Sequence, residues 1–355
     1  MRLTAALTMA LVLAISACLS QGTASTISKH CSQDSVKEAP ADLETAIDEF
    51  VQSIPAADTF RYADPKRDPE DVKALVEGFA KVAGGDLVAA CQALAPVAYR
   101  VVLTTDSKTG RDVVLLRESR GGGGFARAWG LYVVSWPPMA NPSTLTVEVP
   151  HACPHTVPRG CEGGDRLTHL VAVKVFREAN ARYLFINGAD RRANGMFGLS
   201  ECEQDSRCSD VAHQPESPFE KIHEKAVADL GSNTKVYQSH RFLSSNHDPP
   251  PMDNVSPGTS GTANVVVSAG TTSPSPIAGD VAGGIEAAER SFFHVCLFSG
   301  GPDCSQLGAT RNVQKDHMFG GRFVHVEAND TVVRESCEAP CRRDELAAAI
   351  AGVMK

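Results

Sequence analysis

The sequence predicts an α/β protein, a three-layer α/β/α domain built on a mixed, mostly parallel sheet, with a small helical extension at the N-terminus. Three observations predict it. The 355 residues are 43% hydrophobic and 21% charged, an ordinary composition for a globular chain with a sizeable core. From about residue 97, short apolar strands alternate with helical segments. Their order is not a regular strand–helix repeat, which favours a mixed sheet.

The elements follow from local periodicity. Over residues 42–51 and 68–79, apolar residues recur at intervals of three and four, as in amphipathic helices. Asp68 before Pro69 is typical of a helix start. We predict strands over 99–104, 113–117, 131–136, 145–149, 183–186, 236–239, 265–268, 292–298 and 323–327, and further helices over 166–178, 217–230 and 342–354.

The first residues predict an export signal. Arg2 precedes an apolar stretch, 3–19, that is shorter than a membrane span requires. Cys18 ends the sequence Ile-Ser-Ala-Cys, which resembles the bacterial lipobox, whereas ordinary cleavage near Ala24 is the alternative. We expect a protein of the periplasm or outer envelope, or a secreted one, that meets the membrane only through a lipid on Cys18. The expected divisions are a signal peptide (1–17), a tether (18–40), a helical region (41–96) and a catalytic domain (97–355).

The cysteines predict disulfides. Of the 11 cysteines, ten remain when Cys18 is set aside, and an exported chain meets an oxidising compartment. The sequence does not fix their connectivity, and closeness along the chain is the guide for four of the five expected pairs. These pairs are Cys31–Cys91, Cys153–Cys161, Cys202–Cys208, Cys296–Cys304 and Cys337–Cys341.

Charge restricts the expected partners. The formal net charge of −8 argues against nucleic acid, because binding phosphates requires a basic surface.

The candidate site follows from the ends of the predicted strands. In open α/β sheets, ligands bind beyond the carboxyl ends of the strands. His151 directly follows the strand 145–149, Asp165 opens the next helix, and His240 follows the strand 236–239. Two histidines and a carboxylate with an open fourth position form a catalytic zinc site. The alternative interpretation is that Asp165 caps the helix and His151 lies on the surface.

Further polar residues follow other strands. Glu327 ends a late strand, where a carboxylate near zinc can act as general base, although a solvated Glu is common there. Arg191 and Arg192 could hold a substrate carboxylate or stabilise an oxyanion, or be ordinary surface residues. Asp210 and His213 are expected to line the site or to support a metal ligand.

The order of these motifs resembles the zinc carboxypeptidase superfamily, and within it the N-formylglutamate amidohydrolases and phage poly-γ-glutamate hydrolases. Asp165-Arg-Leu-Thr168 is similar to the Glu-x-x-Thr turn of the latter, and Phe323-Val-His-Val-Glu327 looks like the strand that bears the general base. The resemblance spans about residues 130–335. The superfamily's usual first motif is His-x-x-Glu, whereas position 154 here is Pro, and Glu162 could replace Asp165 as the acidic ligand.

The resemblance implies a Zn²⁺ ion bound by His151, Asp165 and His240, with Glu327 as general acid/base and Arg191 or Arg192 holding the substrate. The implied function is an exported zinc hydrolase that cleaves an amide bond in a peptide, γ-glutamyl or cell-envelope substrate. The alternative is a non-catalytic envelope lipoprotein with a degenerate hydrolase fold that acts as a binding or assembly module.

Overall fold

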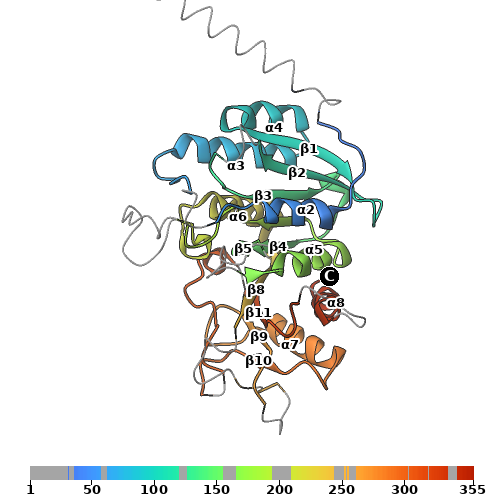
Figure 1. The fold of residues 1–355 in the computed structure, drawn as a ribbon, viewed down its shortest axis with the longest axis vertical. Helices are drawn as coiled ribbons and strands as arrows, with labels where there is room; N and C mark the ends of the chain where they lie inside the picture. The colour runs from blue at the N-terminus through green and yellow to red at the C-terminus, as the bar shows by residue number, and fades with distance from the viewer. Residues whose placement is uncertain are drawn as a thin grey trace, which may run out of the picture.

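A nine-stranded sheet runs through the protein in the order β1-β2-β3-β7-β4-β8-β11-β9-β10, with helices against it (Figure 1). The predicted α/β class and mixed sheet are confirmed. The computed structural model describes residues 31, 36–56, 62–119, 126–154, 165–193, 209–243, 252, 254–255, 261–302, 304–318, 320–334 and 342–355.

The strands of this sheet are β1 (Tyr99–Thr105), β2 (Asp112–Glu118), β3 (Leu131–Ser135), β4 (Leu145–Val149), β7 (Tyr183–Ile186), β8 (Lys235–Phe242), β9 (Val265–Ser268), β10 (Val295–Leu297) and β11 (Phe323–Asn329). A separate small sheet joins β5 (Ala152–Cys153) and β6 (Asp165–Arg166). The α-helices are α2 (Leu43–Gln52), α3 (Pro69–Ala83), α4 (Leu87–Leu94), α5 (Thr168–Glu178), α6 (Pro218–Leu230), α7 (Pro276–Ala288) and α8 (Arg342–Met354).

The centre of the sheet is parallel. Strands β7, β4, β8 and β11 are neighbours that run in the same direction, so their carboxyl ends meet at one edge. The meander β1–β2–β3 joins β7 antiparallel, and the pair β9–β10 joins β11 antiparallel. Every residue of β4, β7 and β11 is buried, as expected for strands that helices cover on both faces.

The N-terminal helices belong to both helical layers. On one face, Phe79 of α3 and Phe219 of α6 pack edge-on against Phe185 of β7, with ring centroids 5.6 and 6.2 Å apart. On the other face α5 contacts β4 and β8, α2 packs on α5, and α8 packs between α5 and α7 (Figure 1). One continuous apolar core therefore extends from Val36 to Met354.

Two details of the helices differ from expectation. Helix α3 begins at Pro69 as predicted, but the side chain of Asp68 makes no capping hydrogen bond. Helix α7 lies where no element was predicted, because its three glycines weaken any helical signal. A Cβ on one of them, Gly284, would lie 3.0 Å from Val353 of α8, so glycine permits the close approach of α7 and α8.

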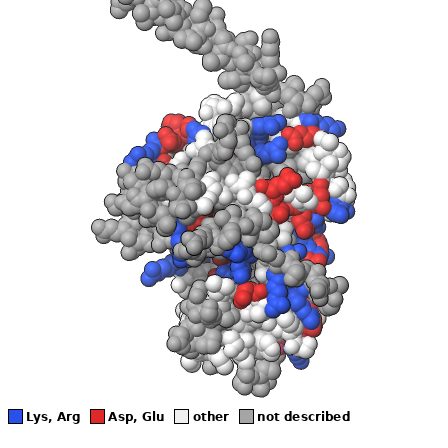
Figure 2. Space-filling view, viewed as in Figure 1, with Lys and Arg blue, Asp and Glu red and all other residues white. Residues whose placement is uncertain are grey.

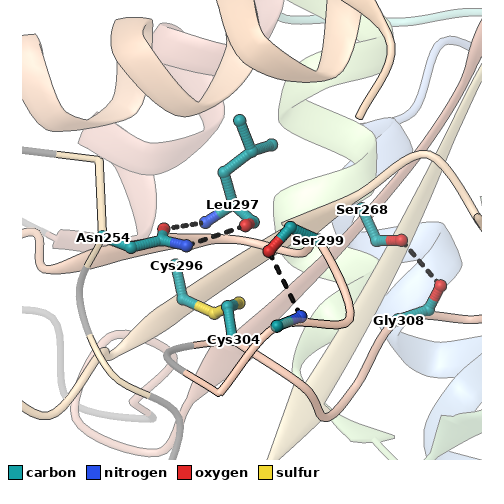
Figure 3. The surroundings of a disulfide bond; sticks show 8 residues. Asn254, Ser268, Cys296, Leu297, Ser299, Cys304 and Gly308 are labelled. Carbon is teal, nitrogen blue, oxygen red and sulfur yellow. Dashed lines mark hydrogen bonds between the residues drawn. A yellow bond between two sulfur atoms is a disulfide. The ribbon is translucent and has the colours of Figure 1, made fainter. Parts of the chain in front are cut away.

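Two predicted disulfides are confirmed, Cys31–Cys91 and Cys296–Cys304. Beside the second, Asn254 binds both backbone groups of Leu297, at 2.7 and 3.0 Å (Figure 3). Cys153 is also disulfide-bonded. Disulfides are typical of proteins outside the cytoplasm.

Several predictions fall on residues outside the described ranges. They are the signal peptide, Cys18, most of the tether, the pairs Cys202–Cys208 and Cys337–Cys341, and Cys161 as the partner of Cys153. Within the described ranges, no helix combines the length and the apolar character that crossing a bilayer requires. Basic and acidic side chains are intermixed on the face shown in Figure 2.

Arg177 of α5 ties the N-terminal helices to the sheet. Its guanidinium donates to Asp42, the N-cap of α2, at 2.6 Å and to Asp106, next to β1, at 2.7 and 2.9 Å. Burial would raise the pKa of Asp106, but the hydrogen bonds from Arg177 and Thr109 outweigh it and lower that pKa. The pKa of Asp42 is lowered in the same way, with Arg177 again outweighing burial.

We expect Arg177→Met to lower the free energy of unfolding by about 2–4 kcal/mol at pH 7, because it leaves a buried carboxylate without its cation. Since both carboxyl pKa values are depressed in the folded state, this contribution is present above the unfolded pKa of about 3.9 and is lost as pH falls through the folded values. Urea unfolding at several pH values measures the difference. Arg100→Met is the control, since that side chain is 54% exposed and its ion pair contributes less than about 1 kcal/mol. If the loss of unfolding free energy in Arg177→Met stayed the same in acid, this account would be contradicted.

Candidate metal centre

The parallel strands bring the predicted site residues to one edge of the sheet. His151 follows the end of β4, and His240 and Glu327 lie near the carboxyl ends of β8 and β11. The register pairs His240 directly with Glu327, so both side chains point to the same face. Asp165 reaches the same place through β6, where its N–H donates to the carbonyl oxygen of His151 at 2.9 Å.

Three donor atoms converge there. Asp165 Oδ2 lies 2.9 Å from His240 Nδ1 and 3.5 Å from His151 Nδ1, and the two imidazole centroids are 4.9 Å apart. All three residues are only 4% exposed. The alternative interpretation is therefore wrong: His151 is not a surface residue, and Asp165 does not cap α5, whose N-cap residue is Leu167 without a side-chain cap.

The opposite nitrogens of both imidazoles face hydrogen-bond acceptors. His151 Nε2 lies 2.9 Å from Asp210 Oδ1, and His240 Nε2 lies 3.3 Å from Gln238 Oε1. These oxygens favour a hydrogen on each Nε2, which leaves the Nδ1 lone pairs directed toward Asp165 when the rings are neutral. Metal-binding histidines usually donate their second N–H to an oxygen in this way.

The electrostatics show a site crowded with ionisable groups. Burial lowers the pKa of His151, but Asp210 and Asp165 outweigh it and raise that pKa to about 9. Burial would raise the pKa of Asp165, yet the adjacent imidazoles of His151 and His240 hold it well below its usual range. Burial, and then the charge of Asp165, raise the pKa of Glu327 to about 8. A divalent cation would compete with the proton on His151, so metal binding is coupled to pH.

The donor set fits a divalent metal ion. In a tetrahedral site with bonds of about 2.0–2.2 Å, neighbouring ligand atoms lie about 3.3–3.6 Å apart. The spacings of 2.9 and 3.5 Å around Asp165 Oδ2 are close to that requirement. Imidazole nitrogen and carboxylate oxygen are ligands that zinc and several other transition metals accept.

His325 is the residue of this cluster that the sequence analysis missed. Its ring lies 4.3 Å from that of His240, and its Nε2 lies 3.6 Å from Glu327 Oε1. It is 3% exposed. The available signal was its position two residues before Glu327 on a strand, which places both side chains on the same face.

The remaining predicted residues are placed as follows. Arg191 Nη1 lies 3.5 Å from His151 Nδ1, and His213 Nδ1 lies 3.2 Å from Asp210 Oδ2. Arg192 donates its backbone N–H to Asp190 at 2.7 Å. Glu162 lies outside the described residues.

A layer of buried polar side chains supports the centre. Gln238 donates to Glu148 Oε2 at 2.8 Å, accepts from Asn312 at 2.7 Å, and presents the same Oε1 to His240. Glu148 Oε1 in turn lies 2.7 Å from His223 Nδ1 on α6. These hydrogen bonds fix the orientation of the Gln238 side-chain amide, so that its oxygen faces His240 Nε2.

Two other features lie apart from this centre. Glu220 Oε1 and Glu224 Oε1 lie 3.0 and 3.6 Å from His317 Nε2, an arrangement that ion pairing explains. The pKa of Glu220 is raised to about 7, chiefly because the side chain is buried. A groove of about 710 Å³ between α3 and α6, lined by Val72, Val76 and neighbouring residues, includes none of the site residues.

Comparisons with known proteins give remote likenesses. No protein-family model matches the sequence, and no curated protein matches it. The gene product Atu2144 from Agrobacterium tumefaciens is 14% identical, with a TM-score of 0.32 over 59% of this chain and 85% of its own. A "putative metallopeptidase" from Shewanella denitrificans OS217 is 9% identical, with a TM-score of 0.30 over 80% of this chain and 87% of its own. Likenesses this remote do not assign the chain to a family or give it a role.

We expect Gln238→Leu to lower the free energy of unfolding by about 2–4 kcal/mol, because Glu148 and Asn312 would lose a buried partner. Thr146→Val is the matched control on the same strand face as Glu148. Its fully buried Oγ1 has no hydrogen-bond partner among the described residues, so its removal is expected to be neutral or slightly stabilising. Equal losses in the two variants, measured by urea unfolding, would contradict the importance of the polar layer.

Proposed function

We propose that this protein is an exported, zinc-dependent hydrolase in which His151, Asp165 and His240 hold the metal. One observation carries the proposal: both Nδ1 atoms converge on a single carboxylate oxygen, while both Nε2 atoms face oxygen acceptors. All three residues are buried, and a bound cation would supply the compensating charge that a buried carboxylate needs.

The residues around this centre have complementary roles. When bound, zinc would polarise the substrate carbonyl and lower the pKa of a water molecule. Glu327, paired in register with His240, takes the proton of the attacking water and passes it to the leaving amine. Arg191, beside His151, stabilises negative charge on the substrate. Asp210 holds the ring of His151, with His213 on its other oxygen.

The substrate is an amide of peptide, γ-glutamyl or cell-envelope type. The resemblance of the motif order to that of zinc carboxypeptidase-like amidohydrolases supports this class, as does an arginine suited to a substrate carboxylate. Export is supported by the apolar N-terminus and by the disulfides, and a lipid on Cys18 would be the membrane attachment. The net charge of −8 supports a partner other than nucleic acid.

We expect the purified full-length chain to bind one zinc ion, as measured by elemental analysis after dialysis. His151→Ala and His240→Ala should lose the zinc because each removes a ligand. Glu327→Gln should keep it but lower kcat by about 10²–10⁴-fold on a panel of peptide and γ-glutamyl amides, because it removes the general base. His294→Ala, outside the site, is the control.

A zinc-free protein with a cooperative unfolding transition, unaffected by the changes at His151 and His240, would reject the hydrolase. That result would favour the non-catalytic binding or assembly module instead.

A further inference from the structure

The proposed function leaves the buried imidazole of His325 unexplained. His325 is 3% exposed, and its Nδ1 has no hydrogen-bond partner among the described residues. The 3.6 Å between its Nε2 and Glu327 Oε1 is too long for a hydrogen bond. A buried polar group without a partner costs free energy, so its presence calls for a ligand.

The possible ligand atoms around His325 lie as close together as those of His151, Asp165 and His240. Ligand atoms of His240, His325 and Glu327 lie within 4.8 Å of one another, as do those of His151, Asp165 and His240. His240 is common to both groups, yet it has one lone pair to offer, because its Nε2 faces Gln238 Oε1. A single ion bound at His240 Nδ1 would account for both groups.

The ring separations are near those expected for a shared ion. Two imidazoles on one metal, each bound at about 2.0–2.1 Å, have ring centroids about 4.5–5.2 Å apart for bond angles of about 90–110°. The centroids of His151 and His240 are 4.9 Å apart, within this range, and those of His240 and His325 are 4.3 Å apart, slightly below it.

We infer that His325 is a further ligand of the metal held by His151, Asp165 and His240, so that the centre contains three imidazoles and one carboxylate. This inference rests on the proposed metal site. The attacking water would then take a fifth position, a coordination number that catalytic zinc sites sometimes reach in the transition state. Glu327, two residues along β11, remains beside that position as the acid/base.

X-ray absorption at the zinc edge counts the imidazoles directly. With one equivalent of Zn²⁺ on the full-length chain, we expect three imidazoles in the wild type and two in His325→Phe, which keeps an aromatic ring but removes both nitrogens. The zinc Kd of His325→Phe should rise at least about tenfold, since changes that only orient a ligand already cost that much. His294→Ala should keep three imidazoles and the wild-type Kd.

Two imidazoles in the wild type, or an unchanged imidazole count and Kd in His325→Phe, would overturn the inference while leaving the proposed function intact. A wild type that binds no zinc would reject both. Should His325→Phe fail to fold, the wild-type count still decides, with His325→Gln as a second variant.

Discussion

The parallel pairing of β8 with β11 determines where the functional side chains lie. In this register Gln238 stands opposite His325 and His240 stands opposite Glu327, all on one face of the sheet. Because side chains alternate along a strand, a slip of one residue would turn one member of each pair to the other face. The neighbouring strand β4 adds Glu148 to the same face and ends just before His151. The centre is thus a consequence of strand register rather than of any continuous motif.

Burying the polar layer on this face costs free energy, which the packing of the surrounding apolar core offsets. Glu148, Gln238 and His223 are fully buried, and such groups are tolerated where nearly every donor and acceptor is paired. Phe185 and the aromatic rings of α3 and α6 cover the adjoining part of the same face. This hydrogen-bonded network beside the apolar side chains holds His240 in one orientation, as binding at a fixed point requires.

The strands could be predicted from sequence because their apolar runs are short and bounded by turns. Helix α7 could not, since its glycines are explained only by the approach of α8. The positions of His151, Asp165 and His240 at one sheet edge followed from the rule about carboxyl ends of strands. The roles of Asp210 and His325 depend on ring orientation and strand register, which no local pattern encodes. For Arg191, only the fold reveals that the guanidinium lies 3.5 Å from His151 Nδ1.

Anomalous diffraction at the zinc edge, on crystals of the full-length protein grown with Zn²⁺, tests the central claim most directly. The account predicts one strong peak within bonding distance of His151 Nδ1, His240 Nδ1 and a carboxylate oxygen of Asp165. A peak at another place, such as beside Glu220 and His317, or none at this edge of the sheet, would contradict it.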